Sequence, residues 1–275
     1  MSNIPDESYG VLLQHVANSQ LDAVVEQVRN LGFAVVESGF APAEITAISE
    51  DFDATSSRYI ETHGENELRR ANEFYTVRAP LTHGGSAFLK LVLNTNLQTA
   101  LRRLISGRFI LNQQNGVISP PASSHHKAKW HRDLPYQHFV STQPLAINAL
   151  FCVDDFTTEN GATFVLPASH LSGEFPSSQY VEKHAMQIEA AAGSFIVLDG
   201  MTFHAGGSNR TDKPRRAVNH LFSIPHFRQQ INIPKNMKIA DLTAAAQDML
   251  GYRDTEASSV RDYLNSRLAK NRQSS

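Results

Sequence analysis

Residues 144–166 read PLAINALFCVDDFTTENGATFVL, which is the pattern of two short strands joined by a turn. The apolar side chains of the first strand share one parity, as they do when alternate residues face one side of a sheet: Ile147, Ala149, Phe151 and Val153. Asn160-Gly161 is a turn signal, and the run that follows it, 162–166, is again rich in strand-forming residues. This stretch predicts antiparallel β-structure in the middle of the chain.

Further strand-like runs lie on both sides of this stretch, at 109–118, 193–198 and 215–223. They are short and bounded by turn residues, and no helical pattern separates them. Several short strands in succession are typical of an antiparallel sandwich or barrel.

The part of the chain before these strands is predicted to be mainly helical. Ser19 begins a helix whose apolar residues recur at helical spacing, and Gly32 is suited to end it. A strand at 33–37 follows, then a helix opened by Pro42, and a further helical stretch spans 86–106.

The composition excludes several classes of protein. The chain has 275 residues and a net charge of −2, so it offers no strongly basic surface for nucleic acid or an anionic membrane. No apolar run approaches the ~18 residues of a membrane span, and the first ten residues, MSNIPDESYG, lack the features of a secretory signal. The single cysteine, Cys152, fits a reducing compartment. We therefore expect a cytoplasmic protein that binds a small molecule, with neither nucleic acid nor membrane as partner and with its oligomeric state open.

The strongest chemical signal is His131-Arg132-Asp133 together with His204. Residues two apart on an extended segment point to the same side, so His131 and Asp133 can both reach one metal ion. An H-x-D motif alone is weak, because the chain has twelve histidines and short spacings arise by chance. With His204 as third ligand, however, the set is the two-histidine, one-carboxylate triad of Fe(II) oxygenases, which leaves coordination positions open.

A basic pair follows the last of these residues. Arg215 and Arg216 open a predicted strand eleven and twelve residues after His204. Arginine binds carboxylates through two parallel hydrogen bonds, which suits the far carboxylate of a 2-oxoglutarate co-substrate. Adjacent strand residues face opposite sides, so only one of the two arginines can reach the interior. The alternative is that both lie on the surface at a strand end.

The motifs occur in an order that resembles the phytanoyl-CoA hydroxylase-like family of Fe(II)- and 2-oxoglutarate-dependent dioxygenases. The resemblance covers most of residues 32–228. It is carried by the following segments: Gly32-Phe-Ala-Val-Val36, Pro42-Ala-Glu44, Trp130-His131-Arg132-Asp133, Asn160-Gly-Ala-Thr-Phe-Val-Leu-Pro-Ala-Ser-His170, and Asp199-Gly200, His204, Asn209 and Arg215-Arg216-Ala217.

The resemblance implies a double-stranded β-helix, also called a jelly roll, with flanking helices. It places the metal ligands at His131, Asp133 and His204, and the co-substrate arginine at Arg215 rather than Arg216. The implied cofactors are Fe(II), 2-oxoglutarate and O2. A serine that the family often has two positions after the distal histidine is replaced here by Gly206, so the resemblance does not extend to one secondary contact with the co-substrate. Related halogenases have a small residue at the position of Asp133, so the carboxylate favours hydroxylation or another oxidation over halogenation.

We therefore expect a mostly β protein with a cupin-like core. Residues 1–275 would form one dioxygenase domain: a mainly helical part at 1–108, the jelly-roll core at 109–228, and a helical part at 229–275.

Four other polar residues are candidates for contacts with the co-substrate: Asn112, Gln137, Asn148 and Thr163. Each also has a structural alternative, since a polar residue in a predicted strand or loop can simply bond to neighbouring backbone. The polar cluster at 125–129 is interpreted either as a lid over the site or as a solvated loop.

Two other classes of function stay open. The same triad could hold Zn(II) for hydrolysis, although Arg215 would then have no role. The chain could also be a jelly-roll binding protein without turnover. The substrate is not identified by sequence, although polar residues near the expected mouth hint at a small polar or anionic molecule: Lys129, Gln137, His138 and Arg228.

Overall fold

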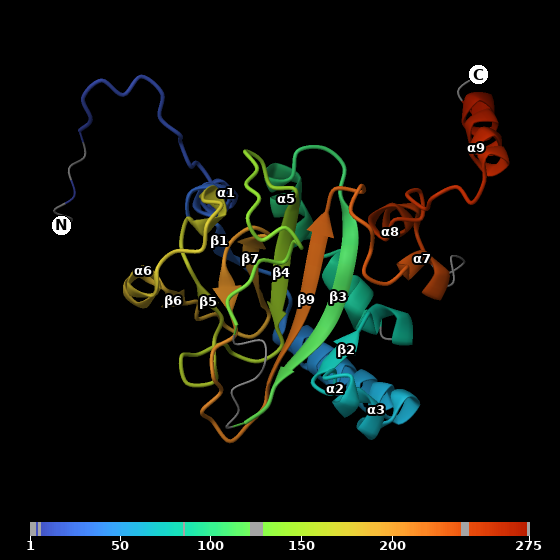
Figure 1. Cartoon of the computed structure of the whole chain (residues 1–275), viewed down its shortest axis with the longest axis horizontal. Coiled ribbons are helices and arrows are strands. Elements are labelled where there is room, and N and C mark those ends of the chain that lie inside the picture. Colours follow the sequence, from blue (N-terminus) through green and yellow to red (C-terminus); the bar gives the residue numbers. More distant parts are fainter. Residues whose placement is uncertain (1–3, 5–6, 85, 122–128, 238–241, 274–275) are drawn as a thin grey trace.

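The computed structural model describes residues 4, 7–84, 86–121, 129–237 and 242–273. Its strands form two antiparallel sheets (Figure 1). The larger has the order β1-β7-β4-β9-β3-β2, with these bounds: β1 Phe33–Glu37, β7 Ser194–Asp199, β4 Ala146–Cys152, β9 Arg215–Ser223, β3 Ile110–Ser119 and β2 Thr76–Arg78. The smaller has the order β6-β5-β8: β6 Met186–Gln187, β5 Phe164–Val165 and β8 His204–Ala205.

Helices cover the outer face of the larger sheet. The main ones are α1 (Gln20–Leu31), α2 (Pro42–His63), α4 (Ser86–Val92) and α5 (Thr95–Leu104). Their apolar residues join Ile147, Ala149 and Phe151 of β4 in one core cluster. Burial of these side chains is the main stabilising term of this layer, because each fully buried Leu, Phe or Ile contributes about 1.5–3 kcal/mol.

The opposite parity of the same strands faces inward. Cys152 of β4, Ile196 and Leu198 of β7, and Ala217 of β9 form a second cluster with residues next to the smaller sheet. The inner face of β4 therefore also carries Asn148, and that of β9 carries Arg215. Alternation along two strands thus decides which polar side chains lie between the sheets.

The remaining helices are short or lie at the ends. They are α3 (Glu65–Arg70), α6 (Ser178–His184), α7 (Ile233–Asn236), α8 (Ala244–Met249) and α9 (Val260–Gln273), with 3₁₀ turns η1 (Pro80–His83) and η3 (Ser169–Leu171). Residues 7–19, before α1, and the helix α9 extend away from the body (Figure 1). Within the described ranges, no helix is both long enough and apolar enough to cross a bilayer.

Most of the predicted elements are confirmed. Ser19 caps α1 by accepting a hydrogen bond from the Asp22 amide, and Gly32 ends the helix at φ 86°. A Cβ on Gly32 would lie 2.3 Å from the Thr202 hydroxyl oxygen, so only glycine fits this turn. The predicted helical stretch at 86–106 is instead two helices, because the Asn94 side chain accepts from the Leu97 amide and begins a new one.

Candidate metal centre

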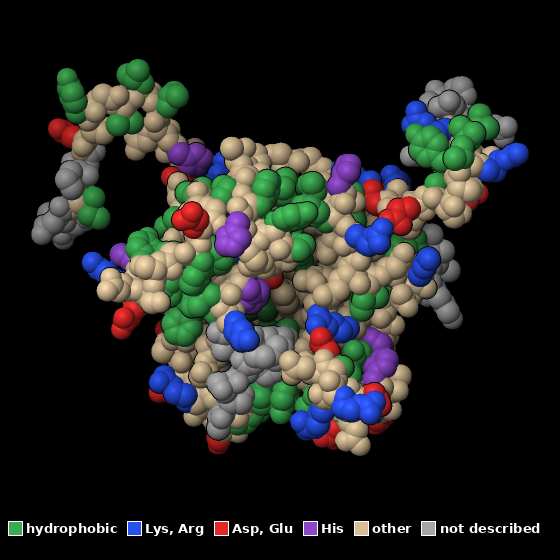
Figure 2. All heavy atoms as spheres, viewed as in Figure 1, with side chains coloured by type: hydrophobic (Ala, Val, Ile, Leu, Met, Phe, Trp, Pro, Cys, Tyr) green, Lys and Arg blue, Asp and Glu red, His purple; other side chains and the backbone are tan. Residues whose placement is uncertain are grey.

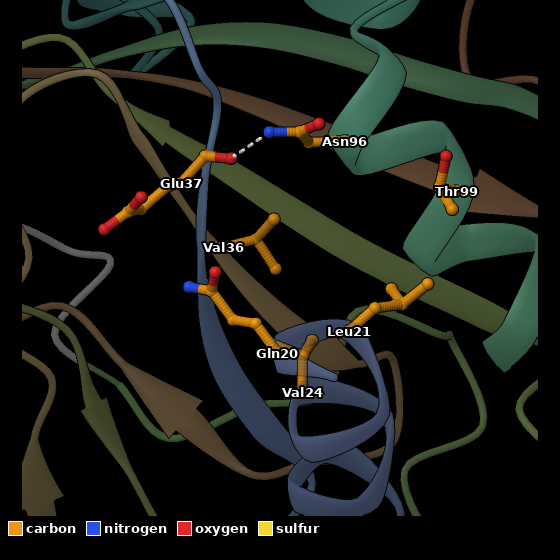
Figure 3. A pocket seen from close by; sticks show the side chains of 7 residues that line it. All are labelled: Gln20, Leu21, Val24, Val36, Glu37, Asn96 and Thr99. Carbon is orange, nitrogen blue, oxygen red and sulfur yellow. Dashed lines mark hydrogen bonds between the residues drawn. The ribbon is translucent and has the colours of Figure 1, made fainter. Parts of the chain in front are cut away.

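A cavity of about 230 Å³ lies between the two sheets and is lined by His131, Asp133 and His204. On the face shown in Figure 2 the surface is hollowed near its middle, with a histidine side chain beside the hollow. A second pocket, of about 220 Å³, lies between α1, β1 and α5 (Figure 3). Its lining is mostly aliphatic and amide, and Glu37 is its one titratable side chain. The chemistry-bearing residues therefore meet in the first cavity.

Backbone pairing brings the two histidines together. His131 and His204 form an isolated antiparallel bridge in which each amide donates to the other's carbonyl at 3.0 Å. Their ring centroids are 4.4 Å apart. The backbone bridge thus brings together two histidines that are seventy-three residues apart in the sequence.

Asp133 completes the group. Its amide donates to the Gly200 carbonyl at 3.1 Å, and its Oδ1 lies 3.8 Å from His204 Nε2. One ligand atom from each of the three residues lies within 4.8 Å of the other two, as a common metal ion requires. This is the H-x-D and distal histidine set that the sequence predicts.

Both imidazoles are oriented by backbone carbonyls. Nδ1 of His131 lies 2.8 Å from the Lys129 carbonyl, and Nδ1 of His204 lies 3.0 Å from the Thr202 carbonyl. A ring that donates from Nδ1 carries its lone pair on Nε2, which fixes the tautomer that a metal needs. Two neutral imidazoles and one carboxylate fit Fe(II), and the same donors also suit Zn(II).

Arg215 lies buried in the same cavity and forms no ion pair within the described ranges. Its Nη1 donates to the Gly161 carbonyl at 2.6 Å, its guanidinium lies 4.1 Å from the Phe156 ring centroid, and its Nε has no partner. Among the residues that the structure describes, no carboxylate forms an ion pair with it, and burial lowers its pKa to about 10. A buried cation without an anion is costly, so the site suits the carboxylate of a ligand. This orphaned group fits 2-oxoglutarate.

Arg216 faces the opposite side of the sheet. Its guanidinium bonds Asp154 at 2.6 Å and Asp53 at 2.7 Å. These hydrogen bonds, above all the one to Asp154, raise its pKa. The two adjacent arginines therefore have separate partners, and only Arg215 lines the cavity.

The four secondary candidates fall into two groups. Thr163 and Asn148 line the cavity. Gln137 lies outside the lining, and its amide bonds the backbone of Arg132 and Leu134, so it ties the turn after the H-x-D motif. Asn112 donates to the carbonyls of residues 227 and 228 and also lies outside the lining.

Gly206 lines the cavity, so no side-chain hydroxyl is available at that position. The predicted lid residues His125, His126 and Lys127 lie outside the described residues.

Sequence reasoning did not single out Arg132, the middle residue of the H-x-D motif. It is 2% exposed and stacks on Phe203 at 3.8 Å. Its guanidinium donates to the carbonyls of Gln137, Ser169 and Ser172, and burial lowers its pKa. Arg132 therefore anchors the segment 169–172 against the metal-site turn.

Five polar residues of the lining were also not predicted: Arg78, Gln113, Asn115, Asn219 and Gln230. The alternation of side chains along a strand could have indicated one of them. Asn219 lies four residues after Arg215 on β9 and therefore faces the same side of the sheet.

Comparison with known proteins gives one consistent family. The profile of the family described as Phytanoyl-CoA dioxygenase (PhyH) matches residues 28–217. The uncharacterized protein Mb1539 of Mycobacterium bovis is 30% identical over 254 residues, which cover 90% of this chain and 92% of the relative. The dioxygenase olcK of Penicillium canescens is 28% identical, covering 83% of this chain and 80% of its own.

The fold also matches a solved structure. EctD from S. alaskensis, solved with 2-oxoglutarate and 5-hydroxyectoine, aligns with a TM-score of 0.63 at 16% identity, over 78% of this chain and 81% of its own. The predicted jelly-roll core with flanking helices is thereby confirmed.

Proposed function

The chain belongs to the phytanoyl-CoA dioxygenase (PhyH) family of Fe(II)- and 2-oxoglutarate-dependent oxygenases, and we propose that it hydroxylates a small polar organic substrate. In this proposal His131, Asp133 and His204 hold Fe(II), and Arg215 binds the far carboxylate of 2-oxoglutarate. Thr163, which lines the same cavity, adds a hydroxyl to the co-substrate site.

The bound iron and co-substrate supply the oxidising chemistry: one atom of O2 enters a substrate C–H bond, the other enters succinate, and CO2 leaves. The protein orients and encloses these groups. The carbonyls of Lys129 and Thr202 hold both imidazoles in one tautomer, and Asn148 fixes the carboxylate of Asp133. Arg215 is 7% exposed, and the low effective dielectric of a buried position strengthens its attraction for a carboxylate.

The observation that carries the proposal is the buried guanidinium of Arg215, which lines the triad's cavity and forms no ion pair with any described carboxylate. A zinc hydrolase with the same three ligands would leave that charge buried without a role. The carboxylate of Asp133 supports hydroxylation over halogenation, because it fills the coordination position that a halide would need. A binding protein without turnover would have no reason to keep the triad and Arg215 in one cavity.

The experiment is an anaerobic titration of 2-oxoglutarate into the Fe(II)-loaded protein, monitored by the visible metal-to-ligand charge-transfer band. Wild type should give the band, and Arg215→Ala should need at least about 30-fold more 2-oxoglutarate, since loss of one partner of a buried charge pair costs ~2–5 kcal/mol. Arg216→Ala is the matched control, because it removes the neighbouring arginine from the opposite face. Absence of a band in metal-loaded wild type would reject the proposal in favour of the zinc or binding-protein alternatives.

A further inference from the structure

The same cavity has a second polar wall. This wall, here called the amide end, consists of Arg78 on β2, Gln113 and Asn115 on β3, Asn219 on β9, and Gln230 after β9. Strand register brings them together, because Asn115 pairs with both Arg78 and Asn219. Four of the five side chains are carboxamides.

The amide end is separate from the proposed co-substrate end. Arg215 and Asn219 lie four residues apart on β9, which corresponds to about 13 Å at the ordinary rise of a strand. Between them the paired residues Ala217 and Val117 present only small apolar surface. A 2-oxoglutarate bound at Arg215 therefore leaves the amide end for a second molecule.

The amide end is formally neutral. Arg78 donates from Nε to Glu73 at 3.0 Å and from Nη2 at 2.5 Å, so its charge is compensated within the protein. Its remaining Nη1 donates to Gln230 Oε1 at 3.2 Å, and to Asn115 Oδ1 at 3.3 Å when that amide is oriented to satisfy both of its groups. An anionic substrate would find no unpaired cation among the five residues of this end.

The basic residues near the mouth do not change this charge balance. None of Lys129, His138 and Arg228 is among the residues that line the cavity. Arg228 is 85% exposed at its side chain and lies 3.3 Å from Glu256. A preference for an anionic substrate thus finds no support at the amide end.

One hydrogen-bond acceptor at the amide end has no donor among the described residues. Oδ1 of Asn219 is buried and has no partner among the described residues. A buried acceptor without a partner costs about 1–3 kcal/mol, so a ligand donor there is favourable. Carboxamides offer one acceptor and two donors each, which matches hydroxyl groups that both donate and accept.

The apolar part of the lining is small and aliphatic: Val117, Leu150, Leu198 and Ala217. Apart from the two histidines of the triad, no described lining residue has a ring on which a flat aromatic substrate could stack. Four scattered aliphatic side chains also offer too little surface for a long acyl chain.

We propose that the amide end binds a neutral, hydroxyl-rich aliphatic molecule, a polyol or glycoside, and holds it with one C–H bond toward the triad. This assignment rests on the proposed function. The balanced reaction converts that C–H bond, O2 and 2-oxoglutarate into C–OH, succinate and CO2.

The test uses the Fe(II)-loaded protein with 2-oxoglutarate. Matched probes are added anaerobically for calorimetry and then in air for succinate formation: methyl glucoside and myo-inositol as neutral polyols, glucuronate and glucose 6-phosphate as anions, adenosine as a flat base, and hexanoate as an acyl chain. We expect a neutral polyol to bind and to raise succinate formation above the level without probe. Asn219→Leu should weaken that binding at least tenfold while the 2-oxoglutarate charge-transfer band persists.

Asn30→Leu, on the exposed face of α1, is the matched control and should bind the polyol as wild type does. Preference for an anion, adenosine or hexanoate overturns the assignment. So does an absence of response to both polyols, or unchanged polyol binding in Asn219→Leu. Failure of the charge-transfer band itself is a separate result that rejects the proposed function, and calorimetry with the polyols on the metal-free protein then still reports on the amide end.

Discussion

The side-chain amide of Asn148 donates a hydrogen bond to Oδ2 of Asp133 at 2.5 Å. Asn148 is 3% exposed on β4, and Oδ1 of Asp133 is the oxygen that lies near His204. Asn148 of β4 therefore binds Oδ2 of Asp133, while Oδ1 faces His204. This contact makes Asn148 a positioning residue for the proposed iron ligand.

Replacement of Asn148 by leucine, which has a similar shape, should lower Fe(II) affinity by about 10–100-fold, the usual effect of losing a partner that orients a metal ligand. Anaerobic Fe(II) titration measures the effect. Asn112→Leu is the control, since this buried strand asparagine bonds only backbone outside the cavity. Asn112→Leu should lower the free energy of unfolding and leave Fe(II) affinity unchanged. Equal Fe(II) affinity in wild type and Asn148→Leu would contradict the positioning role.

His220 should make the protein less stable in acid. It is fully buried, its Nδ1 lies 2.9 Å from the Ala149 carbonyl, and its Nε2 lies 2.9 Å from Gln114 Nε2. This arrangement holds the neutral ring, and burial lowers its pKa to about 4. The unfolded chain binds a proton near pH 6.5 and the folded chain does not, so stability is full above that pH and falls as the pH drops toward 4.

The loss attributable to His220 is about 3 kcal/mol over that window. Urea unfolding of the metal-free protein at pH 7.5 and 4.5 measures it, with His220→Gln as the variant that cannot titrate. The variant is expected to be less stable at pH 7.5 but to lose less stability on acidification. If both proteins lose the same free energy between the two pH values, another group is responsible.

Sequence periodicity predicts much of this structure. The two-residue repeat of a strand and the 3.6-residue repeat of a helix can both be recognised within a short stretch of sequence. The alternation of Ile147 and Asn148 already places one toward the helices and the other toward the cavity. The pairing of Asn115 with Asn219 is different, because it depends on the register of two strands that are distant in sequence. The amide end was therefore not predicted, although Gln113, Asn115 and Asn219 lie in predicted strands.

Arg132 shows a second limit of sequence reasoning. Alternation correctly directs its side chain away from the cavity, which by itself predicts exposure. The segment at 169–172 covers that side, and its carbonyls accept the guanidinium. Only a tertiary contact turns this arginine from a surface residue into a buried one.

Gly161 should be sensitive to a single added methyl group. It has φ +80°, a Cβ there would lie 2.5 Å from the Gly207 carbonyl oxygen, and its own carbonyl accepts from Arg215. Gly107→Ala is a matched control, because Gly107 has φ +89° and nothing within 4 Å of a Cβ. Gly107→Ala should cost about 1–2 kcal/mol from backbone strain alone.

Gly161→Ala should cost about 1–3 kcal/mol more than this control, from overpacking. It should also raise the 2-oxoglutarate concentration needed for the charge-transfer band, since the Gly161 carbonyl that holds Arg215 must move. Chemical denaturation and the anaerobic titration measure the two effects. Equal losses of stability in the two alanine variants would show that the contact with Gly207 relaxes freely.

Arg132 should link the metal-site turn to the segment at 169–172. Its guanidinium donates to the Ser169 carbonyl at 2.7 Å and to those of Gln137 and Ser172. Arg132→Met keeps the apolar contact with Phe203 but removes these donors. The buried Ser169 carbonyl then loses its shorter hydrogen bond and keeps only the one from the Ser172 amide, at a cost of about 1–3 kcal/mol. We expect amide hydrogen exchange at 169–172 to become faster and Fe(II) affinity to fall, because the turn that carries His131 and Asp133 loses its anchor.

Arg132→Lys, which retains the charge but not the planar fork, should restore only part of the protection. Unchanged exchange at 169–172 in Arg132→Met would mean that the segment is held by its own backbone bonds, such as that from the Ser172 amide to the Ser169 carbonyl at 3.3 Å.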